Sequence, residues 1–195
     1  MSGVVIAAPL RLEAALVASA ARGAAVTKTG MGPERAIAAA GGLARQVPGA
    51  LLVLGFCGGL DSSSVPGEVI VADEVYAADD AGHAAARVRC DCASQLLRRV
   101  AGRGLKVRSG SIVCVSRVAL GERRAELRAG GAIAVDMESV WLAAGASGRP
   151  FGVVRVVLDS PSHELLRPQA AIGALRAASA LRKVAGALHD WVPDD

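Results

Sequence analysis

Short, continuous runs of aliphatic residues recur along the chain, and most are followed by a stretch with helical spacing. The clearest runs are Val4–Ala8, Leu51–Leu54, Ser111–Val115 and Phe151–Leu158. Runs that are apolar at nearly every position, rather than at every second one, are typical of strands covered by helices on both faces. The alternation predicts a single α/β domain over residues 1–195, with a mixed, largely parallel central sheet flanked by helices.

The segments between these runs supply the other expected elements. Residues 78–90 are polar and are expected to be irregular. The remaining elements are strands at Val26–Thr29 and Glu68–Val75, helices at Leu12–Arg22 and Pro33–Gln46, a helix capped by Asp91 that reaches Arg103, and helices at Glu122–Arg128, Ser139–Ala146 and Pro168–Trp191.

The composition limits the core and the location of the protein. Apolar residues make up 52% of the chain but aromatic residues only 3%, so the core must consist of Ala, Val, Leu and Ile. No charge-free apolar run reaches the roughly 18 residues that cross a bilayer, so no transmembrane segment is expected. The first residues lack the basic region of a signal peptide, which favours a cytoplasmic protein.

Charge and cysteine content argue against two other classes of function. The formal net charge is +4, but basic residues are scattered among acidic ones and few aromatic side chains are available to stack on bases, so no nucleic-acid binding is expected. Cys57 and Cys114 lie in apolar runs and are expected to be small buried side chains. Cys90 and Cys92 form a lone C-x-C pair without a second pair or a nearby His, which predicts no metal site.

Three strand ends carry chemically unusual residues. The run at 51–54 leads into a glycine-rich segment, Gly55–Gly59, the run at 132–135 leads into Asp136, Met137 and Glu138, and the run at 151–158 leads into Asp159. In an open α/β sheet such ends gather in one crevice. Glycines there permit close backbone approach to a ligand, although a sharp turn would need them equally.

The two strand-end carboxylates suit polyol binding and proton transfer. Glu138 can accept hydrogen bonds from two adjacent hydroxyls, and Asp159 can act as a general acid. Each has a structural alternative that stays open at this point. Glu138 can open the next helix and favour its dipole, and Asp159 can cap a helix or pair with Arg155.

The order of these motifs resembles the nucleoside phosphorylase and nucleosidase superfamily over almost the whole chain. The segments that carry the resemblance are Gly30-Met31-Gly32, Gly55-x-x-Gly58-Gly59-Leu60, Pro66-Gly67-Glu68-Val69-Ile70-Val71-Ala72-Asp73, Val135-Asp136-Met137-Glu138-Ser139 and Arg155-Val156-Val157-Leu158-Asp159. The glycine segment without a Ser after its first Gly, and Asp159-Ser160-Pro161, look most like the hopanoid-associated phosphorylase branch.

The resemblance implies cleavage of a purine N-glycosidic bond without a metal or organic cofactor. It implies that Glu138 holds the ribose 2′ and 3′ hydroxyls, that Met137 packs against the sugar, and that Asp159 protonates the purine at N7. The remaining substrate contacts that it implies are Gly55, Phe56, Gly58 and Gly59 toward the nucleophile, and Val118 and Ala119 toward the base.

The resemblance leaves the nucleophile open. Phosphorolysis, with phosphate as co-substrate, would use Arg11 and Gly32, because the Arg and Ser of the family's bacterial phosphorylases are replaced here by Val53 and Phe56. Hydrolysis would use Glu13 to activate water. The family's Ser before the catalytic Asp is Leu158 here, so the orientation of the Asp is not given by the motif.

The preferred reading is phosphorolysis of an adenosine-type nucleoside, with release of adenine from adenosylhopane in hopanoid biosynthesis. Only about eight residues separate the first helix from Gly30, where relatives carry a longer hairpin, and this would leave room for a large apolar 5′ group. The alternatives are a hydrolytic methylthioadenosine/S-adenosylhomocysteine nucleosidase and a non-catalytic nucleoside-binding relative. Relatives assemble as dimers or larger rings, so a homo-oligomer is expected.

Overall fold

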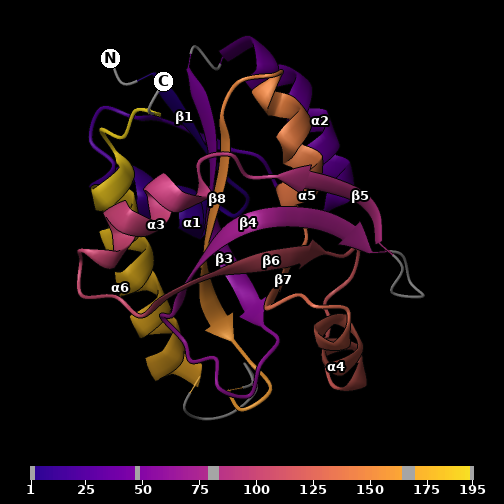
Figure 1. Ribbon diagram of the computed structural model, residues 1–195. Coiled ribbons are helices and arrows are strands. Elements are labelled where there is room, and N and C mark those ends of the chain that lie inside the picture. Colours follow the sequence, from indigo (N-terminus) through magenta and orange to yellow (C-terminus); the bar gives the residue numbers. More distant parts are fainter. Residues whose placement is uncertain (1–2, 47–48, 79–83, 164–169, 194–195) are drawn as a thin grey trace.

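The strands of the described part of the chain, residues 3–46, 49–78, 84–163 and 170–193, join in one mixed sheet in this computed structural model (Figure 1). Its order is β2-β1-β3-β7-β6-β4-β5, and β8 pairs with both β3 and β4. The strands are β1 (Val4–Ala8), β2 (Ala25–Lys28), β3 (Ala50–Gly59), β4 (Val69–Ala78), β5 (Ala84–Arg89), β6 (Val107–Cys114), β7 (Ala134–Asp136) and β8 (Phe151–Asp159).

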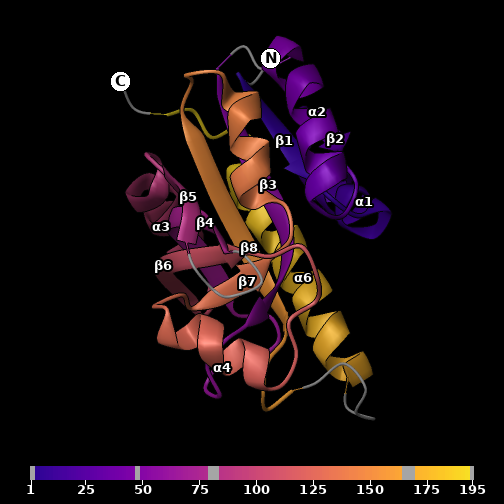
Figure 2. The same ribbon diagram turned by 90° about the vertical axis from the view of Figure 1, so that its right-hand side faces the viewer.

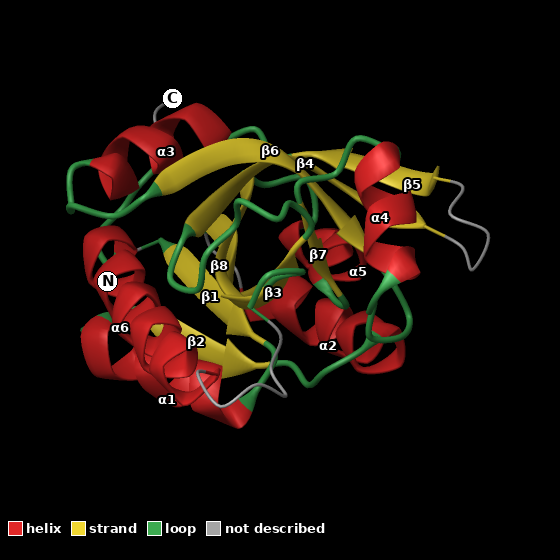
Figure 3. Cartoon of the chain, turned by 90° about the horizontal axis from the view of Figure 1, so that it is seen from below, coloured by secondary structure: helices red, strands yellow, loops and turns green. Residues whose placement is uncertain are grey.

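The long strand β3 lets the sheet close on itself. Along one edge β3 pairs with β8 in parallel, and along the other it pairs first with β1 and then, at Gly58 and Gly59, with β7. β8 continues to β4, β4 to β6, and β6 back to β7. These five strands therefore form a ring around a common centre, seen from below in Figure 3. β3 and β8 are parallel and their carboxyl ends lie at the same end of this ring, where the short, antiparallel β7 pairs with the last residues of β3.

Helices cover the sheet on both sides, as the unbroken apolar runs predict. One side carries α1, α3 and α6, which pack on a buried cluster that includes Leu52, Leu54, Val154 and Val156. The other side carries α2, α5 and the 3₁₀ helix η1, over Leu51, Val53, Val153 and Val157. Figure 2 shows α4 at the lower end of the molecule, below β6 and β7. The helices are α1 (Arg11–Ala20), α2 (Pro33–Gln46), α3 (Ala93–Ala101), α4 (Glu122–Ala129), α5 (Ser139–Leu142), η1 (Ala143–Ala146) and α6 (Ala170–Leu188).

The predicted fold class, a mixed sheet flanked by helices, is confirmed, and several local predictions need correction. The glycine segment is not a loop: β3 runs through Gly59, because Gly58 and Gly59 pair with β7. Part of the segment expected to be irregular is the strand β5. Asp91 does not cap α3, whose N-cap is Cys92. The helix expected at 139–146 is divided into α5 and η1, and the expected start of the last helix at Pro168 lies outside the described residues.

Two further findings concern membranes and cysteines. Among the described helices, none combines the length and hydropathy that a bilayer crossing requires. All four cysteines are buried and unpaired, and the described residues contain no group of three or more potential metal ligands.

Candidate active site

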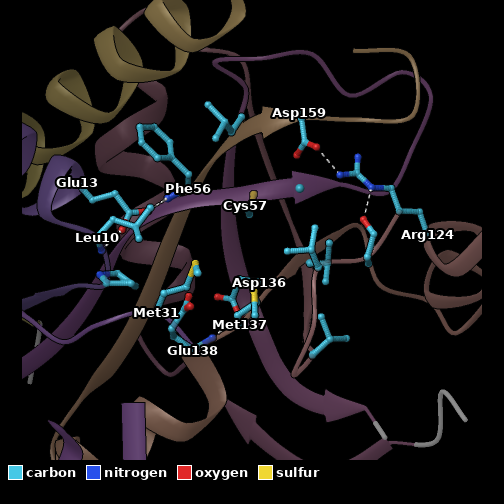
Figure 4. Close-up of a pocket in the computed structure, with 17 residues that line it drawn as sticks. Leu10, Glu13, Met31, Phe56, Cys57, Arg124, Asp136, Met137, Glu138 and Asp159 are labelled. Atoms are coloured by element: carbon cyan, nitrogen blue, oxygen red, sulfur yellow. Dashed lines mark hydrogen bonds and ion pairs between the residues drawn. The ribbon is translucent and has the colours of Figure 1, made fainter. Parts of the chain in front are cut away.

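A cavity of about 180 Å³ lies at the carboxyl ends of β3, β7 and β8, between α1 and α4 (Figure 4). It brings together most of the site residues predicted from the sequence, although they are up to 146 positions apart in the chain (159 − 13). The predicted residues that line it are Glu13, Phe56, Gly58, Val118, Ala119, Met137, Glu138 and Asp159. Figure 4 shows Glu13 and Asp159 on opposite sides of the cavity, with Glu138 on a third side.

The Glu138 carboxylate is held by one backbone donor and one buried cation. Its Oε1 accepts a hydrogen bond of 2.9 Å from the Gly32 N–H, and its Oε2 lies 3.4 Å from Arg155 Nη2. Gly32 can present its N–H in this direction because its φ is +91°, which favours glycine. Burial raises the pKa of Glu138 to about 7, although Arg155 opposes this shift. Glu138 is also the N-cap residue of α5, but its side chain makes no capping bond.

Asp136 also lines the cavity and lies closer to the Arg155 guanidinium than Glu138 does. Its Oδ2 lies 2.7 Å from Arg155 Nη2 and accepts a short hydrogen bond from the Ser139 hydroxyl. Burial disfavours the charge of Asp136, but Arg155, with the Cys114 and Ser139 side chains, holds its pKa below the ordinary value. The same carboxylates raise the pKa of Arg155 against the opposing effect of burial, so this arginine carries a permanent charge. Because the Arg155 guanidinium is closer to Asp136, its electrostatic attraction to Glu138 is the weaker of the two.

Glu13 faces the cavity from α1 and is fixed by two backbone N–H groups. Its Oε2 accepts from Leu10 N and its Oε1 from Phe56 N, both at 2.6 Å. The side chain is buried, and burial raises its pKa despite the opposing charge of Arg155. A carboxyl group with a raised pKa in a cleft has the character of a general base.

Gly55 does not line the cavity, but its lack of a side chain makes the arrangement possible. A Cβ there would lie 2.6 Å from both Glu13 Oε1 and Arg155 Nη1. The buried Arg155 Nη1 has no hydrogen-bond partner among the described residues. Gly59 has a structural role of the same kind, because a Cβ there would lie 2.5 Å from Ser64 Cβ.

Asp159, the last residue of β8, forms an ion pair that the sequence did not predict. Its Oδ2 lies 2.5 Å from Nη2 of Arg124 on α4, and both side chains are almost fully buried. The alternative offered from the sequence, a pair with Arg155, is wrong. Arg124 is held in place by hydrogen bonds from Nε to the Ala119 carbonyl, at 2.9 Å, and from Nη1 to the Gly59 carbonyl, at 3.4 Å.

Neither of the two residues expected to bind phosphate, Arg11 and Gly32, lines the cavity. Arg11 is exposed at the start of α1 and does not line the cavity. Gly32 is buried, and its N–H is used by Glu138. Among the functional residues, the sequence reasoning missed Arg124 because Glu122–Arg128 looked like a charged surface helix. The only available signal was its spacing of three from Leu127, which puts both residues on the buried face of α4.

A closed α/β sheet with a carboxylate-lined cavity at its strand ends defines a class of ligand-binding domain. Within that class, a family model described as the phosphorylase superfamily matches residues 14–185, and the chain therefore belongs to this superfamily. This confirms the resemblance stated from the motifs at the level of the superfamily. No curated protein sequence gives a significant match.

Solved structures of similar fold cover nearly the whole chain at low sequence identity. An S-adenosylhomocysteine nucleosidase from Streptococcus pyogenes, in complex with 5-methylthiotubericidin, has a TM-score of 0.73 and 18% identity, covering 94% of this chain and 95% of its own. A methylthioadenosine/S-adenosylhomocysteine nucleosidase from Neisseria meningitidis has a TM-score of 0.74, 20% identity, and coverage of 96% and 98%. Futalosine hydrolase of Helicobacter pylori has a TM-score of 0.77, 17% identity, and coverage of 96% and 95%.

Proposed function

We propose that this protein hydrolyses the N-glycosidic bond of an adenosine-type nucleoside, with methylthioadenosine and S-adenosylhomocysteine as the first substrates to test. The observation that carries the proposal is one cavity lined by four carboxylates: Asp136 is paired with Arg155, and Glu13, Glu138 and Asp159 face the cavity from three different sides. Membership of the phosphorylase superfamily supports cleavage of a nucleoside, and the names of the solved structures of similar fold support hydrolysis.

On the base side, Asp159 delivers a proton to N7 of the purine as the bond breaks. The purine then leaves as a neutral base rather than as an anion. The donation leaves a carboxylate, which the neighbouring Arg124 guanidinium stabilises through the 2.5 Å contact. Arg124 thereby makes the proton transfer more favourable than it would be for an isolated buried acid.

On the sugar side, Glu138 accepts hydrogen bonds from the ribose 2′ and 3′ hydroxyls. Cleavage gives the sugar an oxocarbenium-like positive charge, and an ionised Glu138 interacts more strongly with that charge than with the neutral substrate. Because the pKa of Glu138 lies at about 7, the ionised fraction rises as the pH rises through neutrality. The bond from Gly32 fixes the carboxylate before the substrate binds.

Glu13 accepts a proton from the attacking water. The water oxygen bonds to the sugar carbon as one of the two water protons passes to Glu13, so the products are the purine and the free sugar. Exchange with solvent then returns a proton to Asp159 and removes one from Glu13. The raised pKa of Glu13 makes it a stronger base than an exposed glutamate. These steps use side chains alone, and we propose that no metal or organic cofactor takes part.

Hydrolysis is proposed in preference to phosphorolysis because of the anion site. A phosphate co-substrate needs several free donors, yet Arg11 lies outside the cavity and the Gly32 N–H already binds Glu138. Arg124, the cation that does line the cavity, is already bonded to Asp159 and to two carbonyls. The cavity therefore contains a base for activating water, Glu13, but no set of free donors for binding phosphate.

The exposed apolar side chains that line the cavity support a second candidate substrate, an adenosine with a bulky 5′ substituent. Leu10, Met31 and Val118 all line the cavity and remain 38%, 46% and 66% exposed. These side chains would contact an apolar 5′ group such as methylthio, or a larger hydrocarbon of the hopane type. Comparing cleavage of methylthioadenosine with that of an adenosine carrying a long 5′ alkyl chain distinguishes the two, because the hopanoid reading requires faster cleavage of the latter.

The decisive test measures adenine release from methylthioadenosine with and without inorganic phosphate. We expect the same rate in both, and losses on the order of 10²-fold or more for Glu13→Gln and for Asp159→Asn. Glu34→Gln, an exposed glutamate in the first turn of α2, is the matched control and should leave the rate unchanged. A rate that requires phosphate would replace hydrolysis by phosphorolysis, and no release from any adenine nucleoside would leave the non-catalytic alternative.

A further inference from the structure

The outward face of α6 combines exposed aliphatic side chains with exposed cations. Ile172 and Leu175 are 56% and 73% exposed, and Arg176, Arg182 and Lys183 are exposed on the same face, because the residues are spaced by three or four positions. α6 contains no acidic residue. Within the described residues, none of the three cations has a hydrogen bond or ion pair to a protein group.

The opposite face of α6 packs the helix onto the domain, and none of the exposed residues just named takes part in this packing. Leu181, Val184 and Leu188 are fully buried in the core against β8 and α1. Substitutions on the outward face therefore leave the packing of the domain intact. They can be used to test the surface without unfolding the protein.

A groove beside the outward face brings two of these cations, Arg176 and Lys183, together with Lys106. A cavity of about 320 Å³ lies between α6 and the residues before β6, and Arg176, Ser179, Lys183 and Lys106 line it. Lys106 is partly neutralised by the buried Glu68, at 3.4 Å, whereas Arg176 and Lys183 have no acidic partner among the residues that the structure describes. The groove can therefore receive a phosphate group from outside, with the aliphatic side chains one or two helical turns away.

We propose that the outward face of α6 docks on the surface of a bilayer that contains anionic phospholipids. The cations would contact the phosphates, and Leu175 and Ile172 would enter the boundary between headgroups and acyl chains, as in helices that lie in the membrane interface. The two protruding aliphatic side chains favour a lipid over a nucleic acid, since a phosphate backbone offers them no apolar surface. The proposal is independent of the chemistry at the cavity.

The position of this face within the fold gives the docking a direction. The N-terminal half of α6, which carries Ile172 and Leu175, lies at the same lower end of the molecule as the tips of β3 and β8 (Figure 1). The aliphatic side chains that enter the bilayer therefore lie toward the end of the sheet where β3 and β8 finish.

Vesicle co-sedimentation of the full chain tests the proposal. Binding is expected to vesicles of phosphatidylcholine mixed with phosphatidylglycerol, to be much weaker for phosphatidylcholine alone, and to fall with added salt. Each surface cation contributes about fivefold to partitioning, so the triple variant Arg176→Gln, Arg182→Gln, Lys183→Gln should bind about a hundredfold more weakly. Leu175→Ser should weaken binding roughly tenfold.

Matched control variants show whether vesicle binding depends on this face or only on the net charge and overall hydrophobicity of the protein. Arg22→Gln, Lys28→Gln and Arg45→Gln together remove the same charge from exposed positions elsewhere, and Ile37→Ser removes an aliphatic side chain that is 59% exposed on α2. Both controls should bind vesicles like the parent. Equal losses in control and test variants, or no preference for anionic vesicles, would overturn the proposal. So would binding of duplex DNA, or self-association lost in Leu175→Ser, without vesicle binding.

Discussion

The buried ion pair between Arg124 and Asp159 makes a quantitative prediction about stability. The two charged atoms are 2.5 Å apart, and their side chains are 6% and 9% exposed. Removing one partner leaves the other as an unpaired buried charge, so Arg124→Met and Asp159→Asn should each lower the free energy of unfolding by about 3–5 kcal/mol at neutral pH. The double variant removes both charges and should cost less than the sum of the single variants.

The single and double variants together form a double-mutant cycle, which measures the coupling energy between the two charges. Arg124→Met also removes the donors to the Ala119 and Gly59 carbonyls, at about 1–3 kcal/mol, but this loss occurs in the single and double variants alike. The coupling energy left for the charge pair should therefore be on the order of 3 kcal/mol. Urea unfolding of the four proteins, followed by circular dichroism at one temperature, measures it.

An exposed pair provides the control for this cycle. Arg99 and Asp190 are ion-paired with side chains 36% and 61% exposed, and the same cycle there should give a much smaller coupling energy, because solvent screens the pair. If the losses at Arg124 and Asp159 add to within about 0.5 kcal/mol, the pair is screened and the argument from burial is refuted.

Three further predictions concern the cavity. Burial raises the pKa of Glu138 from 4.5 to about 7, so the protonated group contributes stability below about pH 4.5 that is lost as the pH rises through 7. The stability of Glu138→Gln relative to the parent should therefore increase between about pH 5 and pH 8, by at most on the order of 3 kcal/mol in urea unfolding, and a constant difference would contradict the raised pKa. Gly55→Ala places a Cβ 2.6 Å from Glu13 Oε1 and should lower nucleoside cleavage on the order of 10²-fold, whereas Gly41→Ala, with nothing within 4 Å in α2, should leave the rate unchanged and raise the melting temperature. Arg124→Met removes the cation that contacts Asp159 and should lower the rate of adenine release, and an unchanged rate would show that Arg124 does not act on this acid.

Elements with uniform chemistry were predictable from the sequence. β8 and α2 were expected at almost the observed bounds, because an unbroken apolar run and a Pro at the first helical position each leave few alternatives. β5 was missed because it lies at the edge of the sheet, paired only with β4, and carries the polar side chains Arg87 and Arg89. Its strand structure depends on a partner that local sequence does not reveal.

The carboxylates of the site were predictable, but their counterions were not. Asp159 and Glu138 stand at strand ends, where a charged residue after an apolar run is a visible signal in the sequence. Arg124 has no such signal, because one arginine in a charged helix looks like any other until the helix packs. The glycine segment was misread as a loop for a related reason, since only the pairing of Gly58 and Gly59 with β7 keeps the strand extended.

Arg155 is a single positive charge placed among Asp136, Glu138 and Glu13, and it is fully buried. Such an arrangement constrains how this family member can change over evolutionary time. A variant that lost only the arginine would bury neighbouring carboxylates without a counterion. Its fold would be most stable at low pH, where the carboxylates are protonated. Substitution of Arg155 is therefore expected to be tolerated only where the three acids are substituted with it.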